Sequence, residues 1–404
     1  MVPQRFAPVL SELAPLVPRF RDAGFKLFLV GGTVRDLMLD RSIDELDFDL
    51  TTDALPEQIK SLLAGWCDSL WTQGEKFGTI GAKKGDRVFE ITTHRAEAYS
   101  PDSRKPDVQF SKDIKEDLSR RDFTINAMAL EITNESPELV DPFNGLADLM
   151  GKVLRTPLSP EVSFSDDPLR MMRAARFISG LGMIAVPELI AAVQAMADRI
   201  TIVSAERIRD EFDRLIVTDR PSFGLWFLVD NGLSKHFLPE LAAMQLEQDP
   251  IHRHKDVLTH TLAVVENVQR DEPCDFRITR LAALFHDVGK PKTRAIKPGK
   301  GITFYHHEAV GARMTRERMR KLRYSVQDIE TVAELVALSA RFHTYQMGWT
   351  DAAVRRYVRD AGAHLAELNV LTKSDCTTRN EKKVAALARR MVELEQRIAD
   401  LTAR

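Results

Sequence analysis

The first 132 residues of the chain combine short β-rich runs with helical stretches. The strand-like runs are KLFLV, LDFDL, TIGAKK and RVFEITT, and PEQIKSLLAGW has helical spacing. After DPFNGLADLMGKVLRTP the strand signals fade, and helical patterns interrupted near prolines continue to the end. The pattern predicts a small domain of helices and strands followed by helical domains, which is an α+β fold.

The length supports several domains, because 404 residues exceed the size of about 250 to 300 residues at which a single core stops growing. We expect an α/β domain over residues 1–150, a helical neck and body over 151–245, a second helical domain over 246–376, and a terminal helix over 377–404. That last segment has a heptad-like pattern of mixed charge, so it predicts either a helix that pairs with a partner or one packed on its own chain.

Composition narrows the class of protein. The chain is 44% hydrophobic and 29% charged, which is ordinary for a globular protein, and no segment has the roughly 20 apolar residues that cross a membrane. Three scattered cysteines favour a reducing, cytoplasmic location. A net charge of −2 means that any nucleic-acid site must be a local basic groove. Neither composition nor pattern predicts the oligomeric state.

The stretch LFLVGGTVRD reads as a buried strand that ends at two glycines. Gly31 and Gly32 have no Cβ, so phosphate oxygens can approach the backbone N–H groups there, and Arg35 can reach the same anion. A simple turn is the alternative. In DELDFDL, Phe48 and Leu50 alternate with Asp47 and Asp49, so a strand would direct both carboxylates to one side.

Paired carboxylates of this kind are suited to Mg²⁺, which prefers oxygen ligands and bridges to substrate phosphates. Glu90, on another predicted strand, is the candidate third acid. A solvated edge strand is the alternative for Asp47 and Asp49. We expect Asp36, Asp44 and Asp53 to be caps or surface residues.

Two further segments place arginines beside acids. In SRRDFTINAMAL, Arg121 could hold a triphosphate, Asp122 could accept a ribose hydroxyl, and Asn126 completes a polar cluster, with a helix cap as the alternative role for Asp122. In SDDPLRMMRAARF, the arginines recur every three residues and form a cationic strip on a predicted helix. These are Arg170, Arg173 and Arg176.

Asp167 and Arg170, three residues apart, could present an acceptor beside donors, a pattern that suits cytosine and adenine. A simple ion pair within the helix is the alternative.

Histidines cluster in the second helical domain. Seven of the ten lie between residues 252 and 343. VLTHTLAVVENV places His260 on one predicted helix, LAALFHDVGKP places His286 and Asp287 on another, and LTKSDCTTRN supplies Asp375. His307 and His343 are further candidates. Such side chains can hold one or two divalent transition metals, whereas the alternative is a helical scaffold with buried, hydrogen-bonded histidines.

Together, LVGGTVRD with DFDL, RRDFTINAMA and DDPLRMMRAARF resemble the motifs of the bacterial tRNA nucleotidyltransferase and poly(A) polymerase family, class II of the DNA polymerase β-like nucleotidyltransferases. The resemblance covers about residues 25–235. It implies that Asp47 and Asp49 bind metal and that Gly32, Arg35, Arg121, Asp122 and the residues Asp167, Arg170, Arg173 and Arg176 contact the nucleotide. SAERIRDEFDRLI is similar to the helix behind the site. Asp166 stands where the family usually has Glu.

The resemblance implies that CCA is added to the tRNA 3′ end from CTP and ATP by a two-metal mechanism, with the acceptor stem gripped by shape and phosphate contacts. HRAEAYSPDSRKPDVQF is similar to the flexible loop of members that switch from CTP to ATP, which favours complete CCA addition. Poly(A) polymerase or addition of A alone remains the alternative.

Residues 250–376 resemble the HD phosphohydrolases through His260, the pair His286 and Asp287, and Asp375. This implies hydrolysis of a phosphate ester, such as a damaged or cyclic-phosphate RNA 3′ end. In a second alternative class of function, the HD domain carries the only chemistry and the front domain senses nucleotide.

Overall fold

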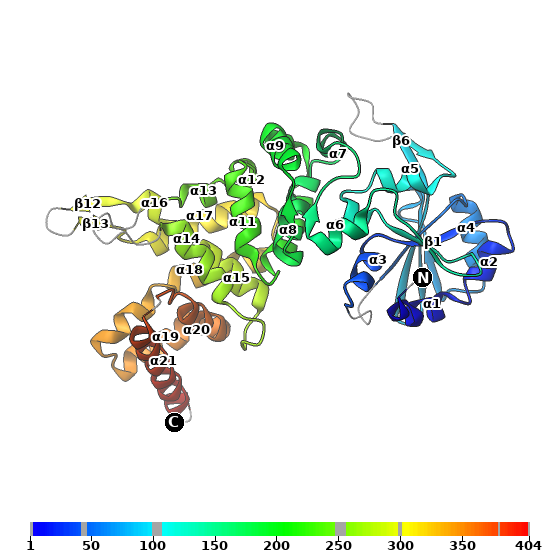
Figure 1. The fold of residues 1–404 in the computed structure, drawn as a ribbon. Helices are drawn as coiled ribbons and strands as arrows, with labels where there is room; N and C mark the ends of the chain where they lie inside the picture. Colours follow the sequence, from blue (N-terminus) through cyan, green and yellow to red (C-terminus); the bar gives the residue numbers. More distant parts are fainter. Residues whose placement is uncertain are drawn as a thin grey trace. The chain divides into compact units, whose positions relative to one another are not determined.

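The computed structural model describes residues 3–41, 47–98, 107–246, 256–297, 301–378 and 380–402 (Figure 1). The chain forms two compact units. The first unit comprises Met1–Arg170 and Met183–Ala192, and the second comprises Met171–Gly182 and Val193–Arg404. Each is described by itself. The boundaries at residues 150, 245 and 376 stay predictions.

A seven-stranded mixed sheet forms the centre of the first unit. Its order is β3-β4-β5-β2-β1-β8-β9, and β2 and β5 are its parallel pair. The strands are β1 (Leu27–Val30), β2 (Phe48–Thr52), β3 (Ser69–Trp71), β4 (Thr79–Lys84), β5 (Arg87–Thr93), β8 (Ala129–Glu131) and β9 (Glu138–Val140). The predicted strands over KLFLV, LDFDL, TIGAKK and RVFEITT are therefore confirmed. All four residues of β1 are buried, because β1 lies inside the sheet between β2 and β8.

Helices cover the sheet where its side chains are apolar. Helix α3 packs on β1, β2 and β8, and α4 packs on β4 and β5. The helices of this part are α1 (Ala7–Leu13), α2 (Val17–Arg21), α3 (Gly31–Met38), α4 (Pro56–Leu63) and α5 (Ile114–Ser119). Phe28, Val30 and Leu118 belong to one buried cluster. The core therefore fixes the strand ends from which the polar residues project.

The segment SRRDFTINAMAL does not form the helix that its pattern allowed. It contains the 3₁₀ turn η3 (Thr124–Asn126) and then enters β8. The stretch HRAEAYSPDSRKPDVQF forms the hairpin of β6 (Arg95–Ala98) and β7 (Asp107–Phe110) where it is described, and residues 99–106 of the predicted flexible loop lie outside the described residues. The first unit also contains α6 (Gly145–Gly151), β10 (Val153–Leu154), α7 (Pro160–Asp166) and β11 (Ile184–Ala185).

The second unit is built mainly of helices, as its pattern predicted. The principal ones are α10 (Ala205–Ile216), α11 (Pro221–Asp230), α14 (Val257–Asn267), α15 (Phe276–Phe285), α17 (His307–Lys321), α18 (Val326–Leu338), α19 (Asp351–Ala361), α20 (Leu365–Ser374) and α21 (Glu381–Thr402). Helix α15 packs against α14, α18 and α20, and its residues from Ile278 to Phe285 are buried. The chain that leaves α15 therefore starts deep inside the unit.

Shorter elements connect these helices. They are α12 (Ser234–Phe237), α13 (Pro239–Ala243), α16 (Lys290–Thr293), β12 (Ala295–Lys297), β13 (Gly301–Thr303) and the 3₁₀ turn η5 (Arg341–Met347). Helices α8 (Arg170–Leu181) and α9 (Pro187–Met196) run through the division between the units. Strands β12 and β13 pair as an antiparallel hairpin, an exception to the predicted all-helical pattern.

The terminal helix α21 packs on α19 and α20 through an apolar stripe that includes the buried Met391 and Leu394. This is the second of the two arrangements that its pattern allowed. None of the helices among the described residues is long and apolar enough to span a bilayer. Cys67, Cys274 and Cys376 are free thiols.

Candidate nucleotide site and metal centre

Three carboxylates lie at neighbouring positions of the central sheet. Asp49 on β2 is paired in parallel register with Glu90 on β5, and Asp47 directly precedes β2. All three side chains are exposed, whereas Phe48 and Leu50 between them are buried. The predicted alternation is therefore present, and the register places Glu90 beside Asp49 because parallel neighbours direct side chains to the same face.

The crowding of these acids changes their chemistry. Partial burial raises the pKa of Glu90, and the negative charges of Asp49 and then Asp47 raise it further. Neighbouring carboxylates of this kind fit a hard divalent cation, whose positive charge would reduce their mutual repulsion. The donor set of Asp47, Asp49 and Glu90 is therefore chemically consistent with the predicted Mg²⁺ site.

The start of α3 forms a cradle beside these acids. Gly31 adopts a left-handed φ of +66°, and a Cβ on it would lie 2.9 Å from an Arg121 Nη1 and 3.9 Å from an Asp49 carboxylate oxygen. Arg121 is held by Asp117 on α5, with Nη2 3.2 Å from Oδ2. Glycine at this position therefore leaves a bare backbone next to a cation and a carboxylate, which suits a bound phosphate.

A chain of hydrogen bonds positions the remaining predicted residues of the first unit. Asn126 Nδ2 donates to Asp122 Oδ1 (3.0 Å), and its Oδ1 accepts from Arg35 Nη1 (2.7 Å). Arg35 also forms a two-pronged pair with Asp36 at 2.8 and 2.9 Å. Asp122 is buried and caps no helix, since η3 begins after Phe123.

This chain corrects two expectations. Asp36, expected to be a cap or surface residue, is the ion-pair partner of Arg35 with a side chain only 13% exposed. Arg35, expected in the first turn of the helix that follows the two glycines, is the fifth residue of α3 and lies in its second turn. Of the other two acids, Asp53 accepts a hydrogen bond from the Lys26 backbone N–H, and Asp44 lies outside the described residues.

The segment SDDPLRMMRAARF is not one helix. Helix α7 ends at Asp166, Asp167 follows as an extended residue, and α8 starts at Arg170. Asp167 Oδ1 accepts the Leu169 N–H at 3.1 Å, and Arg170 donates to the Arg120 and Ser163 carbonyls. Asp167 and Arg170 are therefore presented from two different backbone conformations.

Arg173 and Arg176 belong to the second unit. Arg176 pairs with Glu211 of α10, and Glu211 is only 3% exposed. The Arg176 guanidinium also lies 4.4 Å from the Phe177 ring centroid. Arg173 lies 5.9 Å from the same ring. The neck helix predicted over SAERIRDEFDRLI is α10, capped by Ser204. The nucleotide-binding roles of Arg173 and Arg176 stay predictions.

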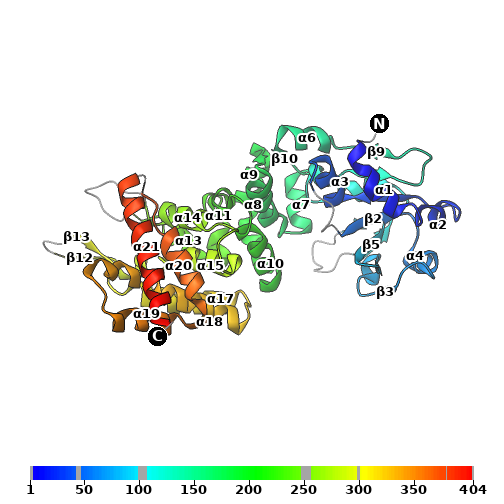
Figure 2. The ribbon, with the colours of Figure 1, turned by 90° about the horizontal axis from the view of Figure 1, so that it is seen from below.

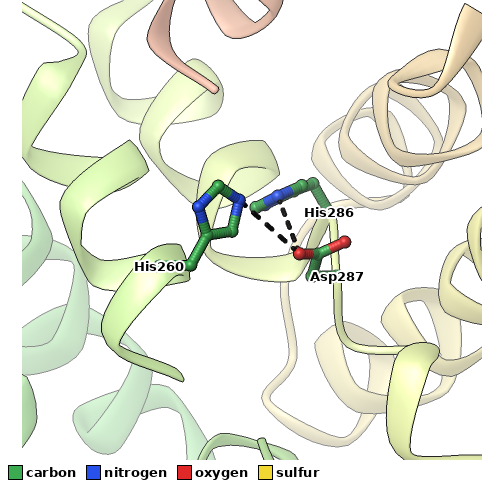
Figure 3. A group of neighbouring side chains, drawn as sticks. All are labelled: His260, His286 and Asp287. Carbon is green, nitrogen blue, oxygen red and sulfur yellow. Dashed lines mark ion pairs between the residues drawn. The ribbon is translucent and has the colours of Figure 1, made fainter. Parts of the chain in front are cut away.

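The second unit brings three predicted ligands into one group. His260 of α14 and His286 and Asp287, directly after α15, have ligand atoms within 4.8 Å of one another (Figure 3). Asp287 Oδ2 lies 3.7 Å from His260 Nε2 and 3.3 Å from His286 Nε2. The Nδ1 atom of each imidazole is hydrogen-bonded outside the group. His286 Nδ1 lies 2.7 Å from the Ala283 carbonyl oxygen, and His260 Nδ1 lies 3.0 Å from Thr377 Oγ1.

The other predicted residues complete the wall of this site. Asp375, at the end of α20, lies 2.9 Å from His260 Nε2 and 3.3 Å from His343 Nε2, and His307 Nε2 lies 3.5 Å from Asp287 Oδ1. They enclose a cavity of about 270 Å³. The cavity is lined by His260, His286, Asp287, Lys290, His307, Ser339, Ala340, His343 and Asp375.

The charged groups of the cavity shift one another's pKa values. Burial would lower the pKa of His286, but Asp287 and Asp375 outweigh burial and raise it to about 10. Burial would raise the pKa of Asp287, but His286, Lys290 and His260 hold it well below its usual range. The Nε2 atom of His286 is nevertheless buried without a hydrogen bond of good geometry. A metal ion fits this donor set, and the alternative of a helical scaffold with hydrogen-bonded histidines stays a prediction.

Sequence reasoning missed three residues of these sites. Lys290 Nζ lies 2.7 Å from Asp287 Oδ2 and lines the cavity, and its position three residues after the HD pair on the chain was the available signal. Asp117, the partner of Arg121, and Asp36, the partner of Arg35, offered no signal because each contact depends on packing.

Comparison with known protein families identifies three segments. Residues 27–155 match the "Poly A polymerase head domain", residues 185–245 match the "Probable RNA and SrmB- binding site of polymerase A", and residues 257–402 match the HD domain. The carboxylates and the Gly31 cradle lie in the first segment, and the histidine cavity lies in the third.

Curated relatives match a little more than half of the chain. The CCA-adding enzyme of Lactobacillus helveticus is 38% identical over 235 residues, which are 58% of this chain and 56% of that protein. The CCA-adding enzyme of Levilactobacillus brevis is 36% identical over 260 residues, 63% of each chain. The chain thus spans less than two thirds of the length of these relatives.

Solved structures share the fold over nearly the whole chain. The Bacillus stearothermophilus CCA-adding enzyme in complex with CTP has a TM-score of 0.69 at 24% identity, over 97% of this chain and 83% of that one. A tRNA nucleotidyltransferase complexed with a primer tRNA and an incoming ATP analog has a TM-score of 0.66 at 22% identity, over 94% and 98%. The chain therefore carries a poly A polymerase head domain, a segment of the polymerase A RNA-binding family and an HD domain, and its resemblance to the bacterial CCA-adding enzymes and poly(A) polymerases is confirmed.

Proposed function

We propose that the protein adds cytidine and adenosine residues to the 3′ end of tRNA from CTP and ATP, completing CCA and releasing pyrophosphate. The observation that carries the proposal is the juxtaposition of Asp49, Glu90 and the Gly31 cradle with Arg121 in the head domain. The choice of substrates is supported by the relatives, which are CCA-adding enzymes, and by the similar structures, which are complexes with CTP or with a primer tRNA and an ATP analog.

In the proposed reaction the tRNA 3′ hydroxyl attacks the nucleotide α-phosphate and pyrophosphate leaves. Mg²⁺, which Asp47 and Asp49 would hold with Glu90, supplies neutralisation of the charge that develops during this displacement. Arg121, anchored by Asp117, would pair with the triphosphate through its planar fork. Asp122 and Asn126, fixed by Arg35, would position the ribose.

Base selection would belong to Asp167 and Arg170, with Arg173 and Arg176 as further nucleotide contacts. An acceptor beside a fork of donors matches the edges of cytosine and adenine, which present an exocyclic amine next to a ring nitrogen. The acceptor stem of tRNA would bind by shape and phosphate contacts. We place this reaction in the cytoplasm, as the free cysteines favour.

The proposal is tested by nucleotide incorporation with Mg²⁺ into three RNAs, namely tRNA ending before CCA, tRNA ending after CC, and an unrelated RNA. Addition of two cytidines and one adenosine to tRNA alone is expected. The double variant Asp47→Asn, Asp49→Asn should be inactive, whereas Asp86→Asn, an exposed acid in the turn between β4 and β5, should be fully active. Polymerisation of ATP on any RNA would instead identify a poly(A) polymerase, and addition of A alone a partial enzyme.

A second function is favoured by the histidine cavity. We propose that the HD site hydrolyses phosphate esters at RNA 3′ ends, with a divalent transition metal held by His260, His286, Asp287 and Asp375, and with His307 and His343 as further ligands. The cluster of His260, His286 and Asp287, whose ligand atoms lie within 4.8 Å of one another, carries this proposal. Among the described residues, the buried Nε2 of His286 also has no hydrogen bond of good geometry. Water would add across one P–O bond of a 2′,3′-cyclic phosphate and yield a phosphomonoester.

Hydrolysis is tested with oligoribonucleotides ending in a 2′,3′-cyclic phosphate or a 3′-phosphate, in the presence of Mn²⁺, Ni²⁺ or Mg²⁺. The variant Asp287→Asn should lose the activity, and the exposed Asp351→Asn should keep it. Absence of turnover with every metal and both substrates would leave the cavity as a metal-binding structural site.

A further inference from the structure

The hairpin of β12 and β13 is a basic, exposed arm next to the HD cavity. It projects away from the helices of the second unit in both views (Figures 1 and 2). Between Asp287 and Glu308 the sequence contains no acidic residue, although the whole chain has a net charge of −2. The side chains of Lys292, Arg294 and Lys297 are exposed, and within the described part of the chain none of them has an ion-pair partner.

Apolar and aromatic groups accompany these cations. Ile296, in the middle of β12, is 74% exposed, and Tyr305, just after β13, is 51% exposed. Lys297 Nζ lies 4.5 Å from the centroid of the Tyr305 ring. Cations beside an exposed aromatic ring are the combination that binds single-stranded nucleic acid, because phosphates meet the charges and a base stacks on the ring.

Both ends of the arm are attached to the wall of the cavity. At the first end, Lys290 lines the cavity and its Nζ lies 5.7 Å from the Phe304 ring centroid. At the second end, His307 lines the cavity and its Nδ1 lies 2.9 Å from the Phe304 carbonyl. The arm therefore begins and ends at residues that face the proposed reaction centre.

The junction is tightly built. A Cβ on Gly289 would lie 2.1 Å from the His307 carbonyl, so the chain entering the arm packs directly on the chain leaving it. His306 has a left-handed φ of +60°, and this reversal separates the exposed Tyr305 from the inward His307. The direction of the arm is thus set by the same residues that build the cavity.

We propose that residues 292–297 together with Tyr305 form an RNA-binding arm that guides a single-stranded RNA 3′ end into the HD cavity. The use of the arm for hydrolysis rests on the proposed HD function, but its binding of RNA does not. A strand bound along the arm would bring its terminal phosphate to Lys290 and His307, where the cavity opens between cationic and imidazole groups.

The first experiment measures binding of a fluorescent single-stranded oligoribonucleotide by the full-length protein in EDTA, by anisotropy. The variant Lys292→Gln, Arg294→Gln, Lys297→Gln should bind roughly tenfold or more weakly, and the slope of log K against log salt should become less steep by about 2, since each lost phosphate contact in a single strand contributes about 0.7. The matched control is Lys382→Gln, Lys383→Gln, Arg389→Gln on the exposed face of α21, which should bind as the wild type. Equal loss in both variants, or in neither, would overturn the proposal.

The aromatic part has its own test. Tyr305→Ala should weaken binding at least about fivefold through loss of base stacking, and Tyr305→Phe should retain it. A 4-thiouridine near the RNA 3′ end should crosslink to the peptide that contains Tyr305. Crosslinks that fall only elsewhere, or binding of the arm to anionic vesicles and not to RNA, would contradict the assignment.

Hydrolysis kinetics distinguish the proposal of an RNA-binding arm from the proposal of ester hydrolysis in the HD cavity. The triple arm variant should raise KM for an RNA 3′-phosphate and leave kcat unchanged, whereas Asp287→Asn should abolish turnover and leave RNA affinity unchanged. If RNA binding depends on the arm but no ester is hydrolysed, the HD function fails and the arm stands. If hydrolysis is normal and the arm variant binds RNA normally, the arm fails and the HD function stands.

Discussion

The two candidate sites balance their charges in opposite ways. In the head domain, partial burial of Glu90, followed by the negative charges of Asp49 and Asp47, raises the pKa of Glu90. In the HD cavity, Asp287 is buried among histidines and Lys290, and its pKa is held low. The acids of the first site are therefore gathered on one exposed face of a sheet, whereas the acid of the second site is buried among histidines and a lysine of its own unit.

The largest expected effect is a crossover between the sites. Asp49→Asn should lower nucleotide incorporation roughly a thousandfold and leave ester hydrolysis unchanged, because only the head loses a charge that the displacement requires. Asp287→Asn should do the reverse. Both rates are measured on the same preparations. A loss of both activities in either variant would contradict the independence of the two sites.

Gly31→Ala tests the cradle of the head. Alanine at a φ of +66° should cost about 1 kcal/mol of stability, and its Cβ would displace Arg121 and weaken nucleotide binding about tenfold. Gly85→Ala is the matched control, because its φ is +58° and no atom lies within 4 Å of the added Cβ. Titration with CTP and urea unfolding separate the two effects, and similar CTP affinities of the two variants would remove the cradle from the site.

Adding metal without nucleotide should stabilise the HD cavity more than the exposed acids of the head domain. A transition metal at about 100 times its Kd should stabilise the HD-containing unit by about 2.7 kcal/mol, since it binds only the folded cavity. Mg²⁺ alone should shift the melting temperature little. Differential scanning fluorimetry of wild type and Asp287→Asn measures both, and a shift that survives in Asp287→Asn would place the metal elsewhere.

The smallest expected effect concerns a buried histidine of the head. Burial lowers the pKa of His94, only partly offset by Asp117 and Asp53, while Arg121 lowers it further and Asp113 raises it. As the pH falls below about 6.5, the unfolded chain binds a proton that the folded chain does not, so stability is lost with acidification at no more than about 1.4 kcal/mol per pH unit.

This loss is measured from urea unfolding of the head between pH 8 and 5. His94→Asn should flatten the profile over that range, at the cost of the contact between His94 Nδ1 and Thr51 Oγ1. An identical pH profile in wild type and variant would show that His94 titrates normally in the fold.

Much of the fold was readable from local patterns. The buried run of β1 and the alternation in β2 follow from side-chain periods that hold whatever the rest of the chain does. The hydrogen bond that Asp167 Oδ1 accepts from the Leu169 N–H was not readable, because it depends on the extended backbone of Asp167 between α7 and α8. The β12 and β13 hairpin was not predicted, because each strand has only three residues and every residue of β12 is exposed, so no alternation of buried and exposed positions marks it.

The sequence by itself determined which residues carry chemistry, since the acids of DFDL, the HD pair and the regularly spaced arginines are chemical types at short spacings. Only the tertiary structure decided which of them meet. Glu90 lies beside Asp49 through a parallel strand register, and Asp375 reaches His260 although 115 positions of chain separate 260 from 375. Such contacts depend on the packing of distant elements around a common core, and no local pattern of residues records that distance.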